Sequence, residues 1–290
     1  MVISVLSGKG GTGKTTVVGA LSELAKKVVK VDCDVDAPNL YLFYKGEDIE
    51  EKEFYGGKKA EIDNSLCIHC GQCEEVCKFG AILEEKVDKF TCEGCGACII
   101  VCPNNAIFLV EEKTADIFLT KTDKGIISRA MMGIGSDGSG KLVTQLRKNV
   151  KPFEERNGIT IIDGSPGIGC AVIASITDTD VALIVTEPTK SGLDDLKRIL
   201  ELAENFETQV MVCINKYDIN LEMSSEIEDY AKSKNLFVVG KIPFDKKVME
   251  AVNTLKPITE FKDSAARNAI EAMWHTMNII MIEKGLLKYN

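Results

Sequence analysis

Residues 2–16 read VISVLSGKGGTGKTT, and this stretch decides the fold. Val2–Leu6 is a short apolar run typical of a buried strand, and Lys14–Lys26 has the pattern of a helix. Between them, Gly8–Thr15 matches G-x4-G-K-[ST], the pattern of a phosphate-binding loop, in the strand–loop–helix context that the pattern requires. The sequence therefore predicts a nucleotide-binding domain built on a P-loop.

The P-loop predicts which residues contact the nucleotide. Backbone N–H groups and the N-terminus of the following helix bind phosphate oxygens. Lys14 is expected to contact the β- and γ-phosphates, and the Thr15 hydroxyl to bind Mg²⁺. The loop residues predicted to bind the nucleotide are Gly10, Gly11, Thr12, Gly13, Lys14, Thr15 and Thr16.

Short apolar runs alternate with helical patterns along most of the chain. Strands of four to six residues separated by helices are typical of βαβ units, with a parallel sheet covered on both faces. We therefore predict an α/β fold with a doubly wound, mostly parallel sheet. The further predicted strands are Val28–Asp32, Asp116–Leu119, Ile159–Ile162, Val181–Val185, Val210–Ile214 and Leu236–Val239.

Composition excludes several classes of protein. The 290 residues are 45% apolar with a net charge of −9, which argues against disorder and against nucleic-acid binding. No run of 18 apolar residues exists, so no membrane span is expected. The start, MVISVLSGKGG, lacks the basic region of a signal peptide. We expect a cytoplasmic protein.

Cysteines are concentrated in one segment. Eight of the eleven lie between Cys67 and Cys102, and they form a repeat in which every cysteine recurs 25 residues later. Residues 61–110 contain eight acids against three lysines, so much of the net charge lies here. We predict a small inserted α+β domain over residues 60–110, with residues 1–59 and 111–290 forming the nucleotide-binding domain.

The spacing within each half is C-x2-C-x2-C-x3-C, the pattern of bacterial two-cluster ferredoxins, in which the fourth cysteine of each run serves the other cluster. Zinc sites favour two separated C-x2-C pairs, so zinc is the weaker alternative. His69 lies between ligands that already fill each site and is expected at the surface. The predicted ligand sets for two [4Fe–4S] clusters are Cys67, Cys70, Cys73 and Cys102, and Cys92, Cys95, Cys98 and Cys77.

The P-loop contains an additional lysine, Lys9, and GKGGTGKTT resembles the deviant Walker A loop of the MinD/nitrogenase-iron-protein/Mrp ATPases. The resemblance implies a homodimer that encloses two ATP molecules, with Lys9 reaching the partner's nucleotide as a charge stabiliser. It also implies that Asp34 orients the attacking water and that Asp32 supports Mg²⁺. The role of Asp36 is left open.

Three further stretches extend this resemblance. Asp163 to Gly167 look like Walker B and switch II, so Asp163 would hold the Mg²⁺ shell and Gly167 would sense the γ-phosphate. Asn215 and Lys216 begin an N-K-x-D sequence, which taken alone matches a guanine-reading motif. In the resembling ATPases this pair contacts adenine, so ATP is favoured, while Asp218 keeps GTP open. The second base-side loop implied by the resemblance contains Pro243, Phe244 and Asp245.

Other features carry weaker interpretations. Gly135–Lys141 imitates a P-loop, but Leu142 replaces the required hydroxyl and no clean strand is expected before it, so we predict a loop leading into a helix over Leu142–Asn149. Residues 265–282 form an amphipathic helix that lacks a lysine-rich face, so packing on the body is favoured over membrane binding. The remaining cysteines are expected to be mostly buried: Cys33, Cys170 and Cys213.

These patterns lead to one main hypothesis with alternatives. The chain looks like a dimeric, ATP-hydrolysing switch with an inserted two-cluster ferredoxin, which couples the nucleotide state to electron transfer or to metallocofactor maturation. Its partner would be a redox or cofactor-assembly protein. The alternatives are a MinD-like positioning ATPase whose clusters sense the redox state, and an iron–sulfur cluster carrier.

Overall fold

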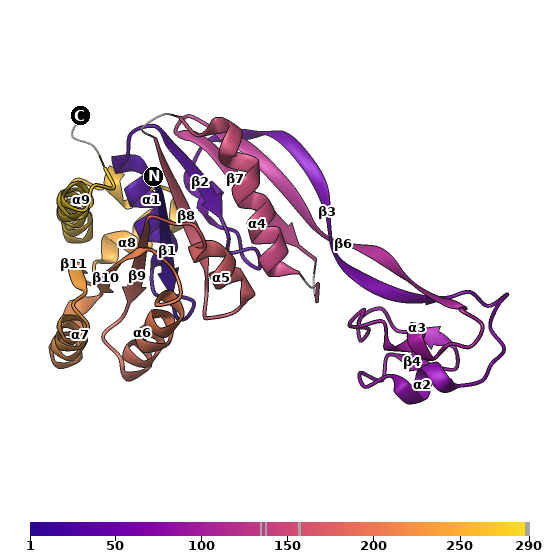
Figure 1. The fold of residues 1–290 in the computed structure, drawn as a ribbon. Coiled ribbons are helices and arrows are strands. Elements are labelled where there is room, and N and C mark those ends of the chain that lie inside the picture. Colours follow the sequence, from indigo (N-terminus) through magenta and orange to yellow (C-terminus); the bar gives the residue numbers. More distant parts are fainter. Residues whose placement is uncertain (134, 137, 156–157, 288–290) are drawn as a thin grey trace. The chain divides into compact units, whose positions relative to one another are not determined.

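A computed structural model describes residues 1–133, 135–136, 138–155 and 158–287 (Figure 1). The chain divides into two compact units. Unit 1 comprises Met1–Glu51, Ile117–Met131 and Ser139–Asn290, and unit 2 comprises Lys52–Asp116 and Met132–Gly138.

The central sheet has the strand order β11-β10-β9-β1-β8-β2-β7-β6-β3. Neighbouring strands from β11 to β7 pair in parallel, so the prediction of a mostly parallel α/β sheet is confirmed. The strands are β1 (Val2–Ser7), β2 (Val28–Asp32), β3 (Gly46–Ile62), β6 (Ile107–Thr122), β7 (Gly125–Met132), β8 (Ile159–Pro166), β9 (Val181–Thr186), β10 (Gln209–Asn215) and β11 (Phe237–Ile242).

Helices cover both faces of the parallel part of the sheet (Figure 1). The α-helices of unit 1 are α1 (Lys14–Leu24), α4 (Ser139–Val150), α5 (Cys170–Ile176), α6 (Lys190–Ala203), α7 (Leu221–Ser233), α8 (Lys246–Asn253) and α9 (Ala265–Glu283). The short 3-10 helices are η1 (Leu40–Phe43), η2 (Lys151–Phe153), η3 (Tyr217–Ile219) and η4 (Ile258–Glu260).

Successive strand residues point to opposite faces and so contribute to two different cores. In β9, Leu183 packs with α1, α8 and α9, whereas Ile184 packs with α5, α6 and α7. This is why the strands of the sequence are continuous apolar runs. Helix α9 buries Met273 and Met277 in the first of these cores, which confirms that it packs on the body. Within the described chain, no helix is long and apolar enough to cross a membrane.

Strands β3 and β6 differ from expectation. Strand β3 was not predicted, because its first half is acidic and exposed, and β6 extends well beyond the predicted Asp116–Leu119. Both strands run across the boundary between the units, so unit 2 begins at Lys52 and its main segment ends at Asp116, outside the limits expected for the insert.

Strand β7 overturns the expectation that no strand precedes the P-loop-like segment at 135–141. Its apolar run is broken by Arg129, which is nevertheless buried. The Arg129 guanidinium donates to Asp48 at 2.7 Å and lies 4.2 Å from the centroids of the Tyr41 and Phe118 rings. These contacts compensate a buried charge within a strand.

Unit 2 contains a second, two-stranded antiparallel sheet and two short helices. The strands are β4 (Ile82–Leu83) and β5 (Lys86–Val87), and the helices are α2 (Gln72–Val76) and α3 (Ala97–Val101). Its small core contains Ala60, Ile82 and Ile107 together with cysteine side chains.

Candidate functional site

The P-loop follows the carboxyl end of β1, and α1 begins at Lys14. Gly11 and Gly13 have φ values of 80° and 88°, in the left-handed region that favours glycine. A Cβ on Gly13 would lie 2.3 Å from Nδ2 of Asn215, and this amide donates to the Thr12 carbonyl at 2.7 Å. The predicted base-side residue Asn215 therefore holds the P-loop in this structure.

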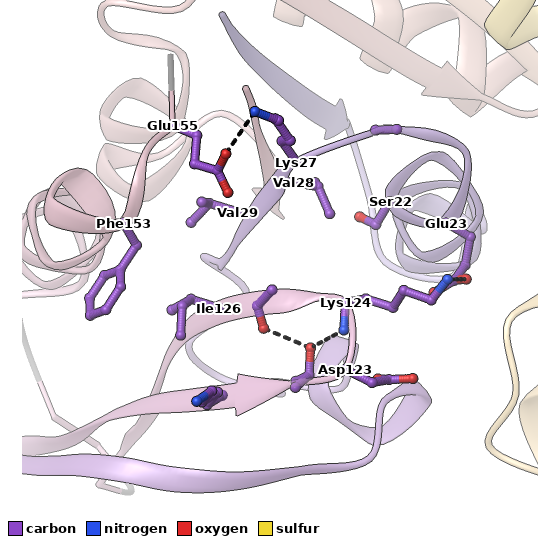
Figure 2. Close-up of a pocket in the computed structure, with 14 residues that line it drawn as sticks. Ser22, Glu23, Lys27, Val28, Val29, Asp123, Lys124, Ile126, Phe153 and Glu155 are labelled. Carbon is purple, nitrogen blue, oxygen red and sulfur yellow. Dashed lines mark hydrogen bonds and ion pairs between the residues drawn. The ribbon is translucent and has the colours of Figure 1, made fainter. Parts of the chain in front are cut away.

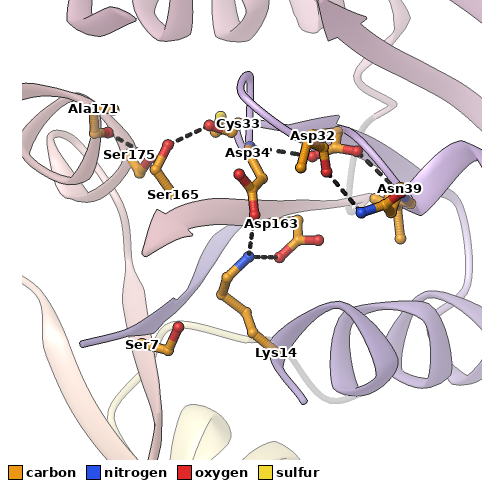
Figure 3. Close-up of polar contacts among 12 residues, drawn as sticks. Ser7, Lys14, Asp32, Cys33, Asp34, Asn39, Asp163, Ser165, Ala171 and Ser175 are labelled. Atoms are coloured by element: carbon orange, nitrogen blue, oxygen red, sulfur yellow. Dashed lines mark hydrogen bonds and ion pairs between the residues drawn. The ribbon is translucent and has the colours of Figure 1, made fainter. Parts of the chain in front are cut away.

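Lys14 lies at the centre of a buried polar network (Figure 3). Its ammonium donates to Asp163 Oδ1 and lies 4.0 Å from Asp34 Oδ2. Burial lowers the pKa of Lys14, but the carboxylates of Asp163 and Asp34 outweigh it and the net pKa is raised. The structure thus brings together the predicted phosphate-binding lysine and two of the predicted acids.

Asp32 and Asp163 lie side by side at the carboxyl ends of β2 and β8, where they are paired in register. The Asp32 carboxylate accepts from the backbone N–H groups of Asp34 at 3.2 Å and Leu40 at 3.0 Å, so it orders the loop after β2. Burial and the neighbouring Asp163 raise the pKa of Asp32 to about 8. Two carboxyl groups this close favour a shared proton or a cation.

The site fits a divalent cation. Asp163 Oδ2 and Thr12 Oγ1 are buried and, within the part of the chain that the structure describes, have no hydrogen-bond partner. Carboxylate and hydroxyl oxygens are the ligands that Mg²⁺ prefers. Asp163, together with the predicted Thr15, could hold the ion beside bound phosphates.

A pocket opens over the P-loop. Asp34 and Pro166 line it together with Ser7 and the loop residues Lys9 to Thr16. Its position outside the carboxyl ends of parallel strands is where ligands bind in open α/β sheets. Gly167 lies beyond this rim, and its N–H donates to the Ser7 carbonyl at 2.9 Å, so this group is engaged within the protein.

Lys9 and Lys216 share one carboxylate that the sequence did not single out. Glu187 Oε1 is 2.6 Å from the Lys216 ammonium, and its Oε2 is 3.7 Å from that of Lys9. Glu187 follows the carboxyl end of β9 and is mostly buried, whereas the Lys9 side chain is 36% exposed. The position of Glu187 at the end of a predicted strand is the only sequence signal that could have indicated this residue.

The other base-side residues have structural partners. Asp218 accepts from the Phe244 N–H at 2.7 Å, which joins two loops. Asp245 caps α8 by accepting from the N–H of Lys247, and it also accepts from Ser264. Although burial raises the pKa of Asp245, these hydrogen bonds outweigh it and the net pKa is lowered. Pro243 lies in the same loop, after β11.

In unit 2 the eight clustered cysteines line two separate pockets. The first is lined by Cys67, Cys70, Cys73 and Cys102, and the second by Cys77, Cys92, Cys95 and Cys98. Each set contains three cysteines of one run and the fourth of the other. These are the two sets that the spacing predicts for a pair of clusters.

The 25-residue repeat extends to the backbone. Ala81 N–H donates to Cys77 Sγ at 3.3 Å, and Ala106 N–H donates to Cys102 Sγ at 3.2 Å. Helices α2 and α3 are both preceded by a glycine with positive φ. His69 and Gly94, also 25 residues apart, both have φ of 58°, and His69 is exposed as expected.

The donor set fits iron–sulfur clusters. Thiolates bind iron–sulfur cubes, and N–H groups directed at sulfur stabilise their charge. Among the described residues, no three His, Cys, Asp or Glu side chains converge on a site for a single metal ion. The four cysteines of each set instead line one common pocket.

The remaining cysteines lie in unit 1. Cys33 and Cys213 are buried, and burial raises the pKa of the Cys213 thiol to about 12. Cys170 is exposed at the start of α5, and a Cβ on Gly140 would lie 3.0 Å from its Cβ. The glycine of the P-loop-like segment thus lets α4 approach α5. Asp137 of that segment lies outside the described residues.

A larger pocket lies at the amino ends of β2 and β7 (Figure 2). Lys27 and Glu155 form an ion pair of 3.0 Å at its rim, and Lys124 pairs with Glu23 at 3.2 Å. The P-loop lies at the opposite, carboxyl ends of the strands, so this pocket is not part of the nucleotide site.

The fold and the P-loop site define an α/β P-loop nucleotide-binding protein. Residues 3–258 match the CobQ/CobB/MinD/ParA nucleotide binding domain, and the chain belongs to this family. An uncharacterized protein of Methanocaldococcus jannaschii is 36% identical over 227 residues, which are 76% of this chain and 79% of that protein.

Two named proteins are also similar. The iron–sulfur cluster carrier protein of Pyrococcus abyssi is 25% identical over 92% of this chain and 82% of its own length. The structure of the septum site-determining protein MinD from Pyrococcus horikoshii, complexed with Mg-ADP, has a TM-score of 0.59 at 20% identity, with 99% of both chains covered. The second likeness concerns the fold alone.

Proposed function

We propose that this protein is a dimeric ATPase that carries two [4Fe–4S] clusters in unit 2 and couples its nucleotide state to electron transfer or to metallocofactor maturation. The observation that carries the proposal is the pair of four-cysteine pockets in a chain of the MinD/ParA family. Each pocket offers a complete ligand set for one cube, formed by cysteines of both runs.

The nucleotide half of the proposal rests on the P-loop pocket. Lys14 would neutralise the β- and γ-phosphates, and Asp163, with its free oxygen, would bind the Mg²⁺ shell. Asp34 lines the same pocket and could orient water. In a dimer, Lys9 would exchange Glu187 for the partner's nucleotide, since a side chain that is 36% exposed can reorient at little cost.

The chain path supports coupling. The loop that contains Asp34 leads through η1 into β3, and β3 continues into unit 2. A change of this loop on hydrolysis would therefore act on the strand that leads to the cysteines.

Anaerobic purification with iron counting and EPR, with and without ATP, tests the proposal. We expect about eight irons per chain, and ATP should change the rate at which a one-electron acceptor reoxidises the reduced protein. A matched pair of variants, Cys67→Ser in the first pocket and Cys213→Ser in the core, should differ, because the first alone removes iron. An iron content well below eight would refute the two-cluster assignment.

An iron–sulfur cluster carrier is the second candidate, favoured by the similarity to the carrier protein of Pyrococcus abyssi. The exposure of Cys70 and Cys95 suits the release of a cluster. Incubation of the reconstituted protein with an apo-ferredoxin distinguishes the two functions, because a carrier loses iron to the acceptor whereas an electron-transfer protein keeps it.

A further inference from the structure

The two cysteine pockets of unit 2 are related by the 25-residue repeat but differ in the charge placed against them. Ala60 lines the second pocket, and the residue 25 positions later, Glu85, lines the first. The preceding residues, Lys59 and Glu84, also correspond in the repeat and have opposite charges. A cation on one side of the repeat is therefore replaced by an anion on the other.

Lys59 is held against a ligand of the second pocket. Its ammonium is buried and donates to the Cys92 carbonyl at 2.7 Å, while the N–H of the next residue, Ala60, donates to Cys92 Sγ at 3.4 Å. Glu112 Oε2 lies 3.6 Å from the ammonium, but its side chain is 31% exposed. The buried ammonium thus places its positive charge against the Cys92 backbone, where water screens that charge little.

The acids near the pockets are more exposed. Glu85, at the first pocket, lies 3.6 Å from His69 Nδ1 with 31% of its side chain exposed, and Glu93, at the second, is exposed. Both pockets thus have one solvated acid on their rims. The second pocket has, in addition, the buried Lys59 ammonium against its ligand Cys92.

We propose that Lys59 raises the reduction potential of the cluster held by Cys77, Cys92, Cys95 and Cys98 relative to that of the other cluster. The inference rests on the proposed function. Reduction adds one negative charge to a cluster, and a buried cation stabilises that charge. Only an electron moves, supplied by an external one-electron reductant. Lys59 is a positioning residue, because it acts through Cys92.

The test is an EPR-monitored redox titration of the full-length, anaerobically purified protein. In Lys59→Met, one midpoint potential should fall while the other stays. We expect at least a tenfold change in the distribution of one electron between the clusters, which corresponds to about 59 mV for a one-electron couple. Lys58→Met is the matched control, because Lys58 is the preceding residue of β3 but is exposed.

Two further variants sharpen the test. Glu112→Gln removes a carboxylate that lies 3.6 Å from the Lys59 ammonium, so the same potential should rise. The Glu112 side chain is 31% exposed, so this variant keeps the test available if Lys59→Met does not fold. In a Cys70→Ala background, which removes the first cluster, the remaining potential should still fall on Lys59→Met.

The outcomes separate the two proposals. Full iron content with unmoved potentials, with both potentials moving together, or with the same change in Lys58→Met would overturn the role of Lys59 alone. Iron content well below eight per chain would overturn the proposed function and this inference with it.

Discussion

Lys30 is the most informative position for a quantitative test of the fold. It lies in the middle of β2, fully buried, where its ammonium donates to the Lys124 carbonyl and lies 4.5 Å from the centroid of the Tyr44 ring. Burial lowers the pKa of Lys30 from 10.5 to about 8, although Glu23 and Asp123 act in the opposite direction. Burial of the charged Lys30 side chain therefore lowers the free energy of unfolding.

The magnitude follows from the pKa. A fall from 10.5 to about 8 corresponds to about 3 kcal/mol. Between these pH values the folded protein binds fewer protons than the unfolded chain, so this group makes the free energy of unfolding rise with pH across that window. Lys30→Met removes the titration. It should be more stable than the wild type at pH 7, and that advantage should shrink by about 3 kcal/mol by pH 10.5.

The assay is urea unfolding at pH 7, 8, 9 and 10, followed by the fluorescence of Trp274. This is the single tryptophan of the chain, and it packs against the core of unit 1. Lys26→Met, at an exposed lysine before β2, serves as the control and should follow the wild type at every pH. A stability difference between Lys30→Met and wild type that does not change with pH would refute the reasoning.

Three further predictions concern the site and the thiols. Lys9→Ala should lower ATP hydrolysis about a thousandfold while nucleotide binding is retained, and an unchanged turnover rate would exclude its role as a charge stabiliser. Asp163→Asn leaves the buried ammonium of Lys14 without its closest carboxylate, so unfolding free energy should fall by about 3–5 kcal/mol, and an urea midpoint near wild type would contradict the buried ion pair. Iodoacetamide should modify Cys170 in the native cluster-loaded protein but spare Cys213, whose pKa of about 12 keeps it protonated at neutral pH, and peptide mass spectrometry decides the outcome.

Much of the sheet could be predicted because its strands are buried on both faces. In a chain that also contains a P-loop, a continuous apolar run such as Val181–Val185 indicates a strand of a parallel sheet that is covered on both faces. Strand β3 escaped prediction because its side chains in the first half are acidic and exposed. Strand β7 escaped because Arg129 interrupts the run, and its ring and carboxylate partners come from distant segments.

The site shows the same division. The cysteine sets could be predicted because their spacing is that of bacterial two-cluster ferredoxins, in which the fourth cysteine of each run serves the other cluster. Glu187 and Lys59 could not be predicted, because their importance depends on which side chain the fold places beside them. The family resemblance implied only that Asp245 lies in a base-side loop. In the structure Asp245 also caps α8 and accepts from a backbone N–H of α9, and this role depends on how the two helices pack.

The exchange of the fourth cysteine between the two runs has a consequence for how the proposed clusters would be loaded. Cys77 and Cys102 each belong to one half of the repeat by sequence and to the opposite pocket by position. Neither half of the repeat can complete a site by itself. Filling one pocket fixes cysteines of both runs, and it therefore also orders the neighbouring ligands of the other pocket. In the proposed two-cluster protein, filling of one pocket should therefore promote filling of the other, so half-loaded molecules should be scarce when the wild-type protein is reconstituted.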